Sequence, residues 1–435
     1  MRSSFLASGH WVSVRRSLLT LCCLAIGQGI FADEQTAERL DRPSVSRSVS
    51  DSDLIAQIDQ AIESGTKFLL DQQQADGTWR SKTYGLLKDG TSLTPLVLWA
   101  FSDSALTEQA KARGLSAVDR WIDHRSEPAQ LTTMPQYPVY TAGLILQTRC
   151  RLNQNDSKAG EEIWRQLLID HQLSARNGWS EHDSQFGGWG YSHEPPRKPN
   201  DDQSLSPLDE PNLSATLCAL EGLSSAGPDH AALTQLRRDV LRFVEHCQNY
   251  RGLTPEPDEQ FNDGGFYFLI GDDVRNKPGI AGTDSSGRTR YLSYGSATAD
   301  GLRLLQLCGL DPHAPRRIAA RRWLLQHLDD DHNPGNYPPA RQHLRPALDF
   351  YYAASLTSAL QREQADNQVP RTSDWSSVLA ARLIKRQLPE GHWQNAAVDV
   401  REDDPLIATS FALRALQICR DLRSSIAIQD SGASR

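Results

Sequence analysis

The segment FGGWGYS, residues 186–192, sets a large aromatic side chain among three glycines. Glycine followed within two residues by an aromatic residue recurs at Trp79, Phe266, Tyr337 and Trp393, each time after an amphipathic run and before a mostly apolar run. Glycine permits a sharp turn, and the aromatic side chain can fill the gap between neighbouring helix pairs, where there is no other core. These five aromatic residues are therefore predicted to be structural.

The runs on either side of these turns predict six amphipathic helices, each followed by an almost wholly apolar helix. The predicted pairs are 54–70 with 93–101, 105–124 with 139–148, 159–171 with 213–223, 231–247 with 297–307, 315–328 with 350–360, and 375–387 with 407–418. An amphipathic helix has one dry face, whereas an apolar helix must be buried on all sides. An inner ring of six helices inside an outer ring of six satisfies both, so the sequence predicts an all-α fold, an α/α6 toroid.

This arrangement also predicts where a functional site lies. Every connection from an outer to an inner helix falls at one mouth of the toroid, and two of these connections, 172–212 and 248–296, are long. Long loops at one end of a rigid scaffold commonly carry function. The inner helices begin at the same mouth, and their positive dipole ends favour acidic groups and anions there.

The N-terminal residues have the pattern of an export signal. Arg15 and Arg16 precede an apolar run at 18–26, which is shorter than the roughly 20 residues that span a bilayer. We predict a signal peptide at 1–32, a flexible leader at 33–52, the toroid at 53–421 and a flexible C-terminal tail at 422–435. The mature chain is expected to have no membrane span and to be periplasmic or extracellular; an uncleaved membrane anchor is the alternative.

Composition narrows the class of partner. The chain has 435 residues, a net charge of −8, 39% hydrophobic residues and 10 tryptophans, which together indicate a packed globular domain. No basic run is long enough to indicate nucleic-acid binding. We expect a monomer that binds a small molecule.

Between residues 54 and 420 the Gly-aromatic repeats resemble the QW-type repeats of the squalene–hopene cyclase and protein prenyltransferase superfamily. The cyclases carry a D-x-D-D acid motif after a GGW turn. The matching positions here are Asp209, Glu210, Pro211 and Asn212, so a proline stands where the resemblance places the proton donor. The loss of that residue removes the standard cyclase acid.

The prenyltransferase branch implies a zinc ion held by Asp, Cys and His, with the histidine in a D-F-Y-H pattern on an inner helix. The matching segment reads LDFYYAASLTSAL, in which Tyr352 replaces the histidine, and no Asp-x-Cys partner precedes it. Neutral tyrosine is a poor zinc ligand. The sequence therefore predicts no bound metal and no cofactor.

A few polar residues near the predicted mouth are candidates for a site. Asp300 lies inside an apolar inner helix, where a carboxylate is costly unless it is paired or faces a wet cavity. Asp300, Asp349 and Asp209 are the candidate catalytic carboxylates, and the candidate ligand-binding residues are Asp300, Tyr352, His193, Asp403 and Asp404. The competing interpretations are a buried pair of Asp300 with Arg303 or Arg345, a helix-start role for Asp209, and a loop hydrogen bond for His193.

Three functions follow from these observations. The leading one is binding of an isoprenoid or lipid-like ligand in a central cavity, without standard cyclase or zinc prenyltransferase chemistry. A carbohydrate-active lyase or hydrolase with carboxylates at the mouth is the second, and a divergent terpenoid cyclase or transferase is the third. Whether the protein is an enzyme stays open at this point.

Overall fold

The computed structural model describes residues 51–101, 104–126, 129–152, 158–200, 203–227, 230–252, 259–328, 332–371 and 373–433. The predicted signal peptide and residues 33–50 of the predicted leader lie outside these ranges. Within them, no helix has the length and apolar character needed to cross a bilayer.

Helices in these ranges alternate between two rings, as the hydrophobic pattern predicts. The outer ring contains α2 (Asp51–Asp71), α4 (Ala105–Asp119), α6 (Lys158–Asp170), α8 (His230–His246), α10 (Pro315–Gln326) and α12 (Trp375–Lys385). The inner ring contains α3 (Leu93–Ala100), α5 (Pro138–Arg151), α7 (Leu213–Ser225), α9 (Gly295–Leu307), α11 (Asp349–Ala365) and α13 (Pro405–Ala433). The α/α6 toroid is thereby confirmed.

The inner ring is closed. Each inner helix packs against the next one in sequence, and α13 packs against α3 to complete the circle. Helix α13 continues through residues 422–433, the segment that the sequence assigns to a tail. Most of its hydrophobic residues up to Cys419 are buried, in keeping with a place inside the outer ring.

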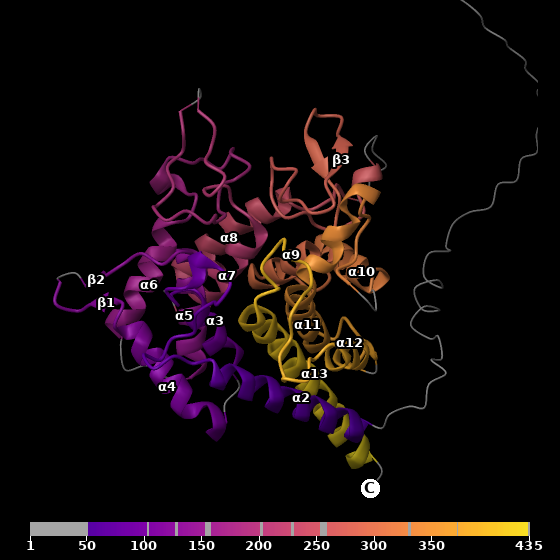
Figure 1. Cartoon of the computed structure of the whole chain (residues 1–435). Coiled ribbons are helices and arrows are strands. Elements are labelled where there is room, and N and C mark those ends of the chain that lie inside the picture. Colours follow the sequence, from indigo (N-terminus) through magenta and orange to yellow (C-terminus); the bar gives the residue numbers. More distant parts are fainter. Residues whose placement is uncertain are drawn as a thin grey trace, which may run out of the picture. The chain divides into compact units, whose positions relative to one another are not determined.

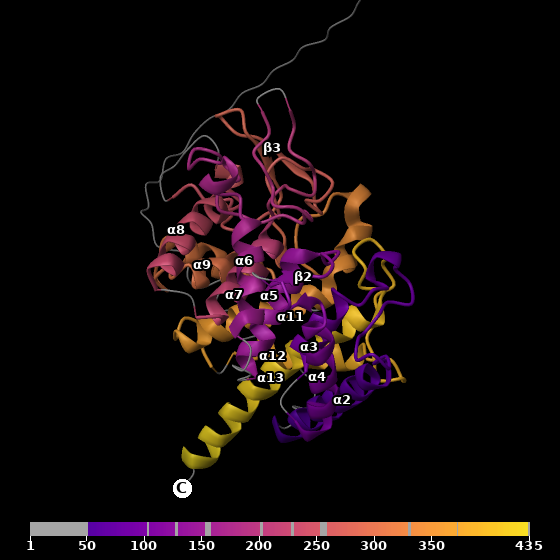
Figure 2. The ribbon, with the colours of Figure 1, turned by 90° about the vertical axis from the view of Figure 1, so that its left-hand side faces the viewer.

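Irregular structure collects at the end of the toroid where the inner helices begin (Figures 1 and 2). It includes 3-10 turns at Gly85–Leu87, Ala175–Asn177, Glu259–Phe261 and Pro339–Leu348. It also includes two antiparallel hairpins, β1 (Ile122–Asp123) with β2 (Gln130–Leu131), and β3 (Ile280–Thr283) with β4 (Thr289–Tyr291). The β1–β2 hairpin occupies the connection after α4, the one that has no Gly-aromatic turn.

Trp189 shows what the aromatic residue of each turn does. Its indole N–H donates to the carbonyl of Leu168 in α6 at 2.7 Å, and its backbone N–H donates to Thr216 Oγ1 in α7 at 3.1 Å. Its side chain is fully buried. The residue therefore ties the end of one outer helix to the start of the following inner helix.

The same pair of bonds recurs at two other turns: Trp79 donates to Leu69 and Thr94, and Trp393 donates to Leu383 and Thr409. Phe266 keeps only the backbone bond, to Thr298 at 3.0 Å. Tyr337 packs edge-on against Tyr294, with ring centroids 6.4 Å apart.

Glycine is required in these turns because they press against the neighbouring outer helix. Gly187 has φ +93°, and a Cβ atom there would lie 2.0 Å from the carbonyl oxygen of Asp239 in α8. Gly391, in the last turn, has φ +89° and meets Ser64 of α2 in the same way, at 2.8 Å. The last repeat thus docks on the first.

Candidate functional site

A cavity of about 370 Å³ lies at the mouth where the inner helices begin. Side chains from the first turns of all six inner helices line it, together with residues from the connections that precede them. The aromatic lining residues are Tyr137, Tyr140, Tyr191, Phe268, Tyr294, Tyr351 and Phe411, and the aliphatic ones are Leu87, Leu93, Leu96, Leu144, Ala297, Leu348, Val400 and Ile407. Most of the lining is therefore apolar.

Asp300 contributes a carboxyl group to this apolar lining. It lies in the second turn of α9 and is 1% exposed. The Tyr351 hydroxyl donates to its Oδ2 at 2.8 Å, and the Ser355 hydroxyl donates to its Oδ1. Burial raises the pKa of Asp300 to about 6, although the charge of Arg303 and these two hydrogen bonds act in the opposite direction.

Arg303 is not an ion-pair partner of Asp300. Its guanidinium pairs with Glu221 in α7 and donates to the Ser355 hydroxyl at 3.2 Å. In the described part of the chain, no ion pair joins Asp300 to Arg303 or to Arg345. Asp300 is thus held by neutral hydroxyl groups at the cavity wall, with an arginine–glutamate pair behind it.

Tyrosine hydroxyls form a second polar element of the cavity. The rings of Tyr140 and Tyr191 stack with centroids 5.8 Å apart, and the Tyr140 hydroxyl donates to Ser214 at 2.6 Å. Burial raises the pKa of both tyrosines, so their hydroxyls stay protonated at neutral pH. They can donate and accept hydrogen bonds to a ligand without contributing charge.

Basic side chains lie on the connections that edge the cavity. Arg275 is paired with Asp272 and Glu210, whereas Lys277 forms no ion pair with any carboxylate in the described ranges. Burial lowers the pKa of Lys277. Arg401 lies between the rings of Tyr84 and Tyr137, 5.4 and 5.3 Å from their centroids.

Glu402 is the other carboxylate in the lining, but it is occupied by the start of α11. It accepts the backbone N–H groups of Asp349, Phe350 and Tyr351 at 2.9, 3.1 and 2.7 Å. Burial raises its pKa to about 7 despite these bonds. It acts as a capping residue supplied from a distant loop.

Of the candidate residues from the sequence, Asp300 lines this cavity and the others do not. Asp349 is buried and forms ion pairs with Arg382, in α12, and with Arg386, which directly follows α12. Tyr352 is fully buried but next to the cavity-lining Tyr351 rather than in the lining.

The loop candidates have local roles. The carbonyl of His193 accepts from His171 Nε2 at 3.1 Å. Burial raises the pKa of Asp209, against a smaller opposite effect of the neighbouring Ser192, while Asn212 caps α7 by accepting from the backbone of Ala215.

The two consecutive aspartates before α13 also make structural contacts. Asp403 accepts from the Tyr84 hydroxyl. Asp404 accepts from the Ser81 hydroxyl and from the backbone N–H of Leu406, the latter at 2.9 Å. The second contact caps the start of α13.

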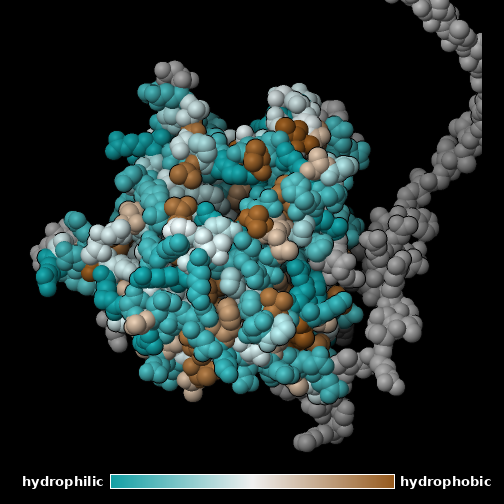
Figure 3. Space-filling view, viewed as in Figure 1, coloured by the Kyte–Doolittle hydropathy of each residue, from teal (hydrophilic) through white to brown (hydrophobic). Residues whose placement is uncertain are grey.

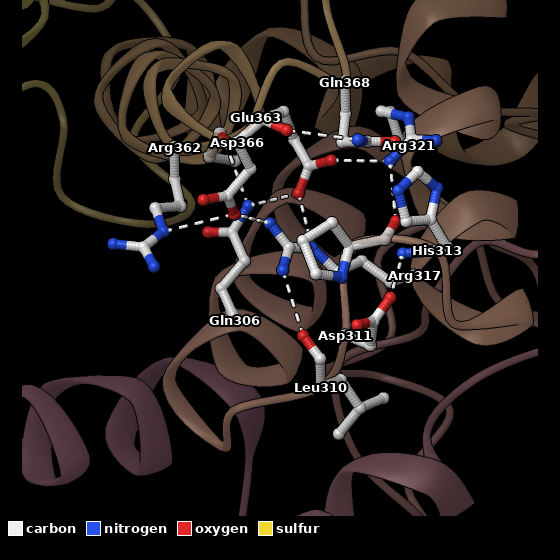
Figure 4. Close-up of polar contacts among 12 residues, drawn as sticks. Gln306, Leu310, Asp311, His313, Arg317, Arg321, Arg362, Glu363, Asp366 and Gln368 are labelled. Atoms are coloured by element: carbon white, nitrogen blue, oxygen red, sulfur yellow. Dashed lines mark hydrogen bonds and ion pairs between the residues drawn. The ribbon is translucent and has the colours of Figure 1, made fainter.

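A buried ionic network, drawn in Figure 4, lies at the opposite mouth, where α9 and α11 end and α10 begins. Glu363, which is fully buried, accepts from Arg317 and Arg321 at 2.7 Å each and from Gln306 at 2.8 Å. Asp366 pairs with Arg317 as well. Because Glu363 is buried with its partners around it and the contacts link α9, α10 and α11, this network has the character of a structural element.

Among the described residues, no group of three or more His, Cys, Asp and Glu side chains is arranged to hold a metal ion. The position that the resemblance gives to a zinc-binding histidine, Tyr352, is fully buried, and burial raises its pKa above the ordinary range for tyrosine. A neutral, buried phenol does not fit a zinc site.

Comparison with solved structures identifies the fold. A variant of the type II terpene cyclase MstE from Scytonema, in complex with geranylgeranyl dihydroxybenzoate, matches with a TM-score of 0.52 and 14% identity, over 85% of this chain and 99% of that one. Cellobiose 2-epimerase from Spirochaeta thermophila DSM 6192 matches with a TM-score of 0.55 and 13% identity, over 87% and 97%. The chain shares the toroid of both enzymes. No family model matches it, and no curated protein sequence matches it significantly.

Several lining residues escape prediction from sequence. Tyr140, Lys277 and Glu402 belong to no motif, and Tyr191 and Tyr351 lie in motifs in which the sequence singles out another residue, Trp189 and Tyr352. The one available signal is the concentration of tyrosines at or just before the starts of the inner helices. The start of a helix does not itself require a tyrosine, so their presence there indicates another role.

Proposed function

We propose that the central cavity binds an isoprenoid or another lipid-like molecule, without the standard cyclase or zinc prenyltransferase chemistry. The observation that carries this proposal is the lining, in which aromatic and aliphatic side chains from the inner helices form an apolar chamber. Apolar pockets with a few polar groups are typical of sites for small apolar ligands. MstE, which has the same fold, is known in complex with a ligand that combines a geranylgeranyl chain and a polar ring.

The surroundings of the mouth support the same class of ligand. Large hydrophobic residues are more than half exposed on the connections between outer and inner helices: Leu86, Leu208, Val274, Ile280 and Val398. Figure 3 shows hydrophobic residues around the hollow at this end of an otherwise mostly hydrophilic face. An apolar rim favours the entry of a lipid-like molecule from an aggregate or a membrane surface.

The polar groups suggest how such a ligand would be oriented. Lys277 and Arg401 lie on the connections that lead into the inner helices, so a polar or anionic head group of the ligand would lie near them, with its apolar body among the tyrosines. Asp300 and Tyr351 would contact the end of the ligand opposite the head group.

Calorimetric measurement of the binding of geranylgeraniol tests this proposal. In Leu144→Trp the new ring would occupy the cavity and abolish binding, whereas Val378→Trp adds the same ring at an exposed site on α12 and leaves binding unchanged. Equal binding by wild type and Leu144→Trp would refute a ligand in this cavity. Mass spectrometry of molecules that co-purify with the native protein would then identify the natural ligand.

A divergent terpenoid cyclase is the second candidate, and Asp300 is the observation that favours it. A buried carboxyl with a pKa of about 6 holds a proton close to neutral pH, as a general acid must. Our leading proposal expects geranylgeraniol and squalene to be recovered unchanged after incubation with the protein. A cyclic product that disappears in Asp300→Asn would instead establish the second candidate.

The lining gives less support to carbohydrate chemistry. Glycosidases use a pair of carboxyl groups that both face the substrate. Here Glu402 is engaged by the start of α11, which leaves Asp300 as the lining carboxylate that is free of backbone contacts.

A further inference from the structure

A second cavity, of about 580 Å³, shares no lining residue with the central one. The end of α8, the residues that follow it, the β3–β4 hairpin and the start of α10 bound this cavity. We name it the arginine pocket, because its lining contains Arg242, Arg251, Arg288, Arg290 and Arg316.

Three of these arginines have carboxylate partners. The pairs are Arg242 with Glu181 at 2.6 Å, Arg316 with Glu245 at 3.1 Å, and Arg251 with Asp284. Arg288 and Arg290 form no ion pair with a carboxylate in the part of the chain that the structure describes. The pocket therefore carries an excess of positive charge.

Arg290 makes this excess costly, because it is 3% exposed. It donates to the carbonyl of Gln248 at 3.0 Å and to the side-chain oxygen of Asn249 at 2.8 Å, and it lies 5.6 Å from the ring of Tyr267. Its Nε atom is buried and has no hydrogen-bond partner among the described residues. A buried guanidinium with neutral partners and an unused donor is stabilised when an anion binds beside it.

His246 also lines the arginine pocket and lies in its positive electrostatic potential. Its Nδ1 lies 3.5 Å from a guanidinium nitrogen of Arg288. Burial lowers the pKa of His246, and the charges of Arg288, Arg316 and Arg290 lower it further. An anion bound among these arginines would oppose the second effect.

The chemistry of the lining indicates the class of anion. Guanidinium groups bind phosphate and sulfate through paired, charge-assisted hydrogen bonds. The volume exceeds that of a single oxyanion, and Gln248, Tyr250 and Ser286 supply neutral polar groups around the charged ones. We propose that the arginine pocket binds the phosphate or sulfate group of a monoester carried by a polar molecule such as a sugar.

Calorimetry of the full chain in a chloride buffer free of phosphate tests the proposal. Glucose 6-phosphate or glucose 6-sulfate should bind, inorganic phosphate should bind more weakly, and glucose should not bind. If inorganic phosphate bound as tightly as both esters, the site would be one for the free ion. If unmodified glucose bound as tightly as the esters, the proposal that the arginines recognise a charged group would be overturned. Absence of binding by either ester would overturn the proposal.

Matched variants locate the binding to the arginine pocket. Arg288 is exposed on the hairpin, so Arg288→Gln should keep the fold and weaken ester binding roughly tenfold through the loss of one charge-assisted contact. Arg322→Gln removes another exposed arginine, on α10 outside the pocket, and should bind like wild type. Equal affinities in all three proteins would place the anion elsewhere.

A titration of His246 separates binding from a merely structural role of these arginines. Its imidazole signal in NMR spectra, assigned by comparison with His246→Gln, should titrate at higher pH when glucose 6-phosphate is bound. Binding without any change in this titration would contradict a site among these arginines.

Discussion

Replacement of Asp300 by asparagine should change how the stability of the protein depends on pH. The pKa of this carboxyl rises from 3.8 to about 6 on folding, because burial disfavours the charged form. Between these two values the folded chain holds the proton more tightly than the unfolded chain, so the free energy of unfolding falls as pH rises. This pKa shift corresponds to about 3 kcal/mol of the free energy of unfolding, which is lost as pH rises from about 4 to about 7.

Asparagine keeps the volume of the side chain and cannot ionise. Its carbonyl oxygen can accept from the Tyr351 or the Ser355 hydroxyl, and Arg303 keeps its partner Glu221. The free energy of unfolding of Asp300→Asn, relative to wild type, should therefore increase by about 3 kcal/mol as pH is raised from about 4 to about 7.

Urea unfolding of both proteins across this pH range provides the measurement. The difference between the two curves removes the contributions of all other titrating groups, including Glu402. A difference that is constant with pH would refute the raised pKa. A loss of about 3–5 kcal/mol in Asp300→Asn at neutral pH would show that Arg303 depends on Asp300 for its charge balance.

Other parts of the structure lead to three further predictions. Gly187→Ala should lower the free energy of unfolding by at least about 2 kcal/mol more than Gly271→Ala. Both glycines have similar positive φ angles, but only the first would place Cβ against the backbone of α8, so equal losses in urea unfolding would contradict the close packing of this turn. Thr216→Val should cost about 1–3 kcal/mol in thermal unfolding, because the buried backbone N–H of Trp189 loses its acceptor; an unchanged midpoint would show that this bond is dispensable. Elemental analysis should find no stoichiometric zinc, and one tightly bound zinc per chain would revive a transferase role.

The fold could be predicted because it depends on local and repeated signals. The apolar period of the outer helices, the apolar runs of the inner helices and the glycines of the turns are each visible within a short window of sequence. The threonine that accepts from the turn, such as Thr216 for Trp189, is also regularly placed, although its role becomes clear only from the hydrogen bond.

The site was less accessible to such reasoning, for two physical reasons. Adjacent residues of a helix point about 100° apart, and the family motif selects Tyr352. The residue that faces the cavity is its neighbour Tyr351, which the motif does not single out. The acidic run at Glu402, Asp403 and Asp404 lies in a loop without periodicity, and each carboxylate has a different partner. Asp300 could be found because a carboxylate within an apolar helix needs a reason to be there.

The closed ring has a consequence for the order in which the protein can be assembled. Helix α2, the first of the toroid, packs against α13 and α12, the last ones (Figure 1). Gln387, just after α12, donates to the carbonyl of Ala61 in α2 at 2.9 Å, and Gly391 lies against Ser64.

During synthesis, which proceeds from the N-terminus, α2 therefore emerges long before the helices that cover its apolar face. Its hydrophobic side must stay soluble, or be shielded by other molecules, until the C-terminal repeat is complete. For a chain built in this way, the last step of folding joins its two ends, and an incomplete chain leaves its first helix without α13, the inner helix against which it packs.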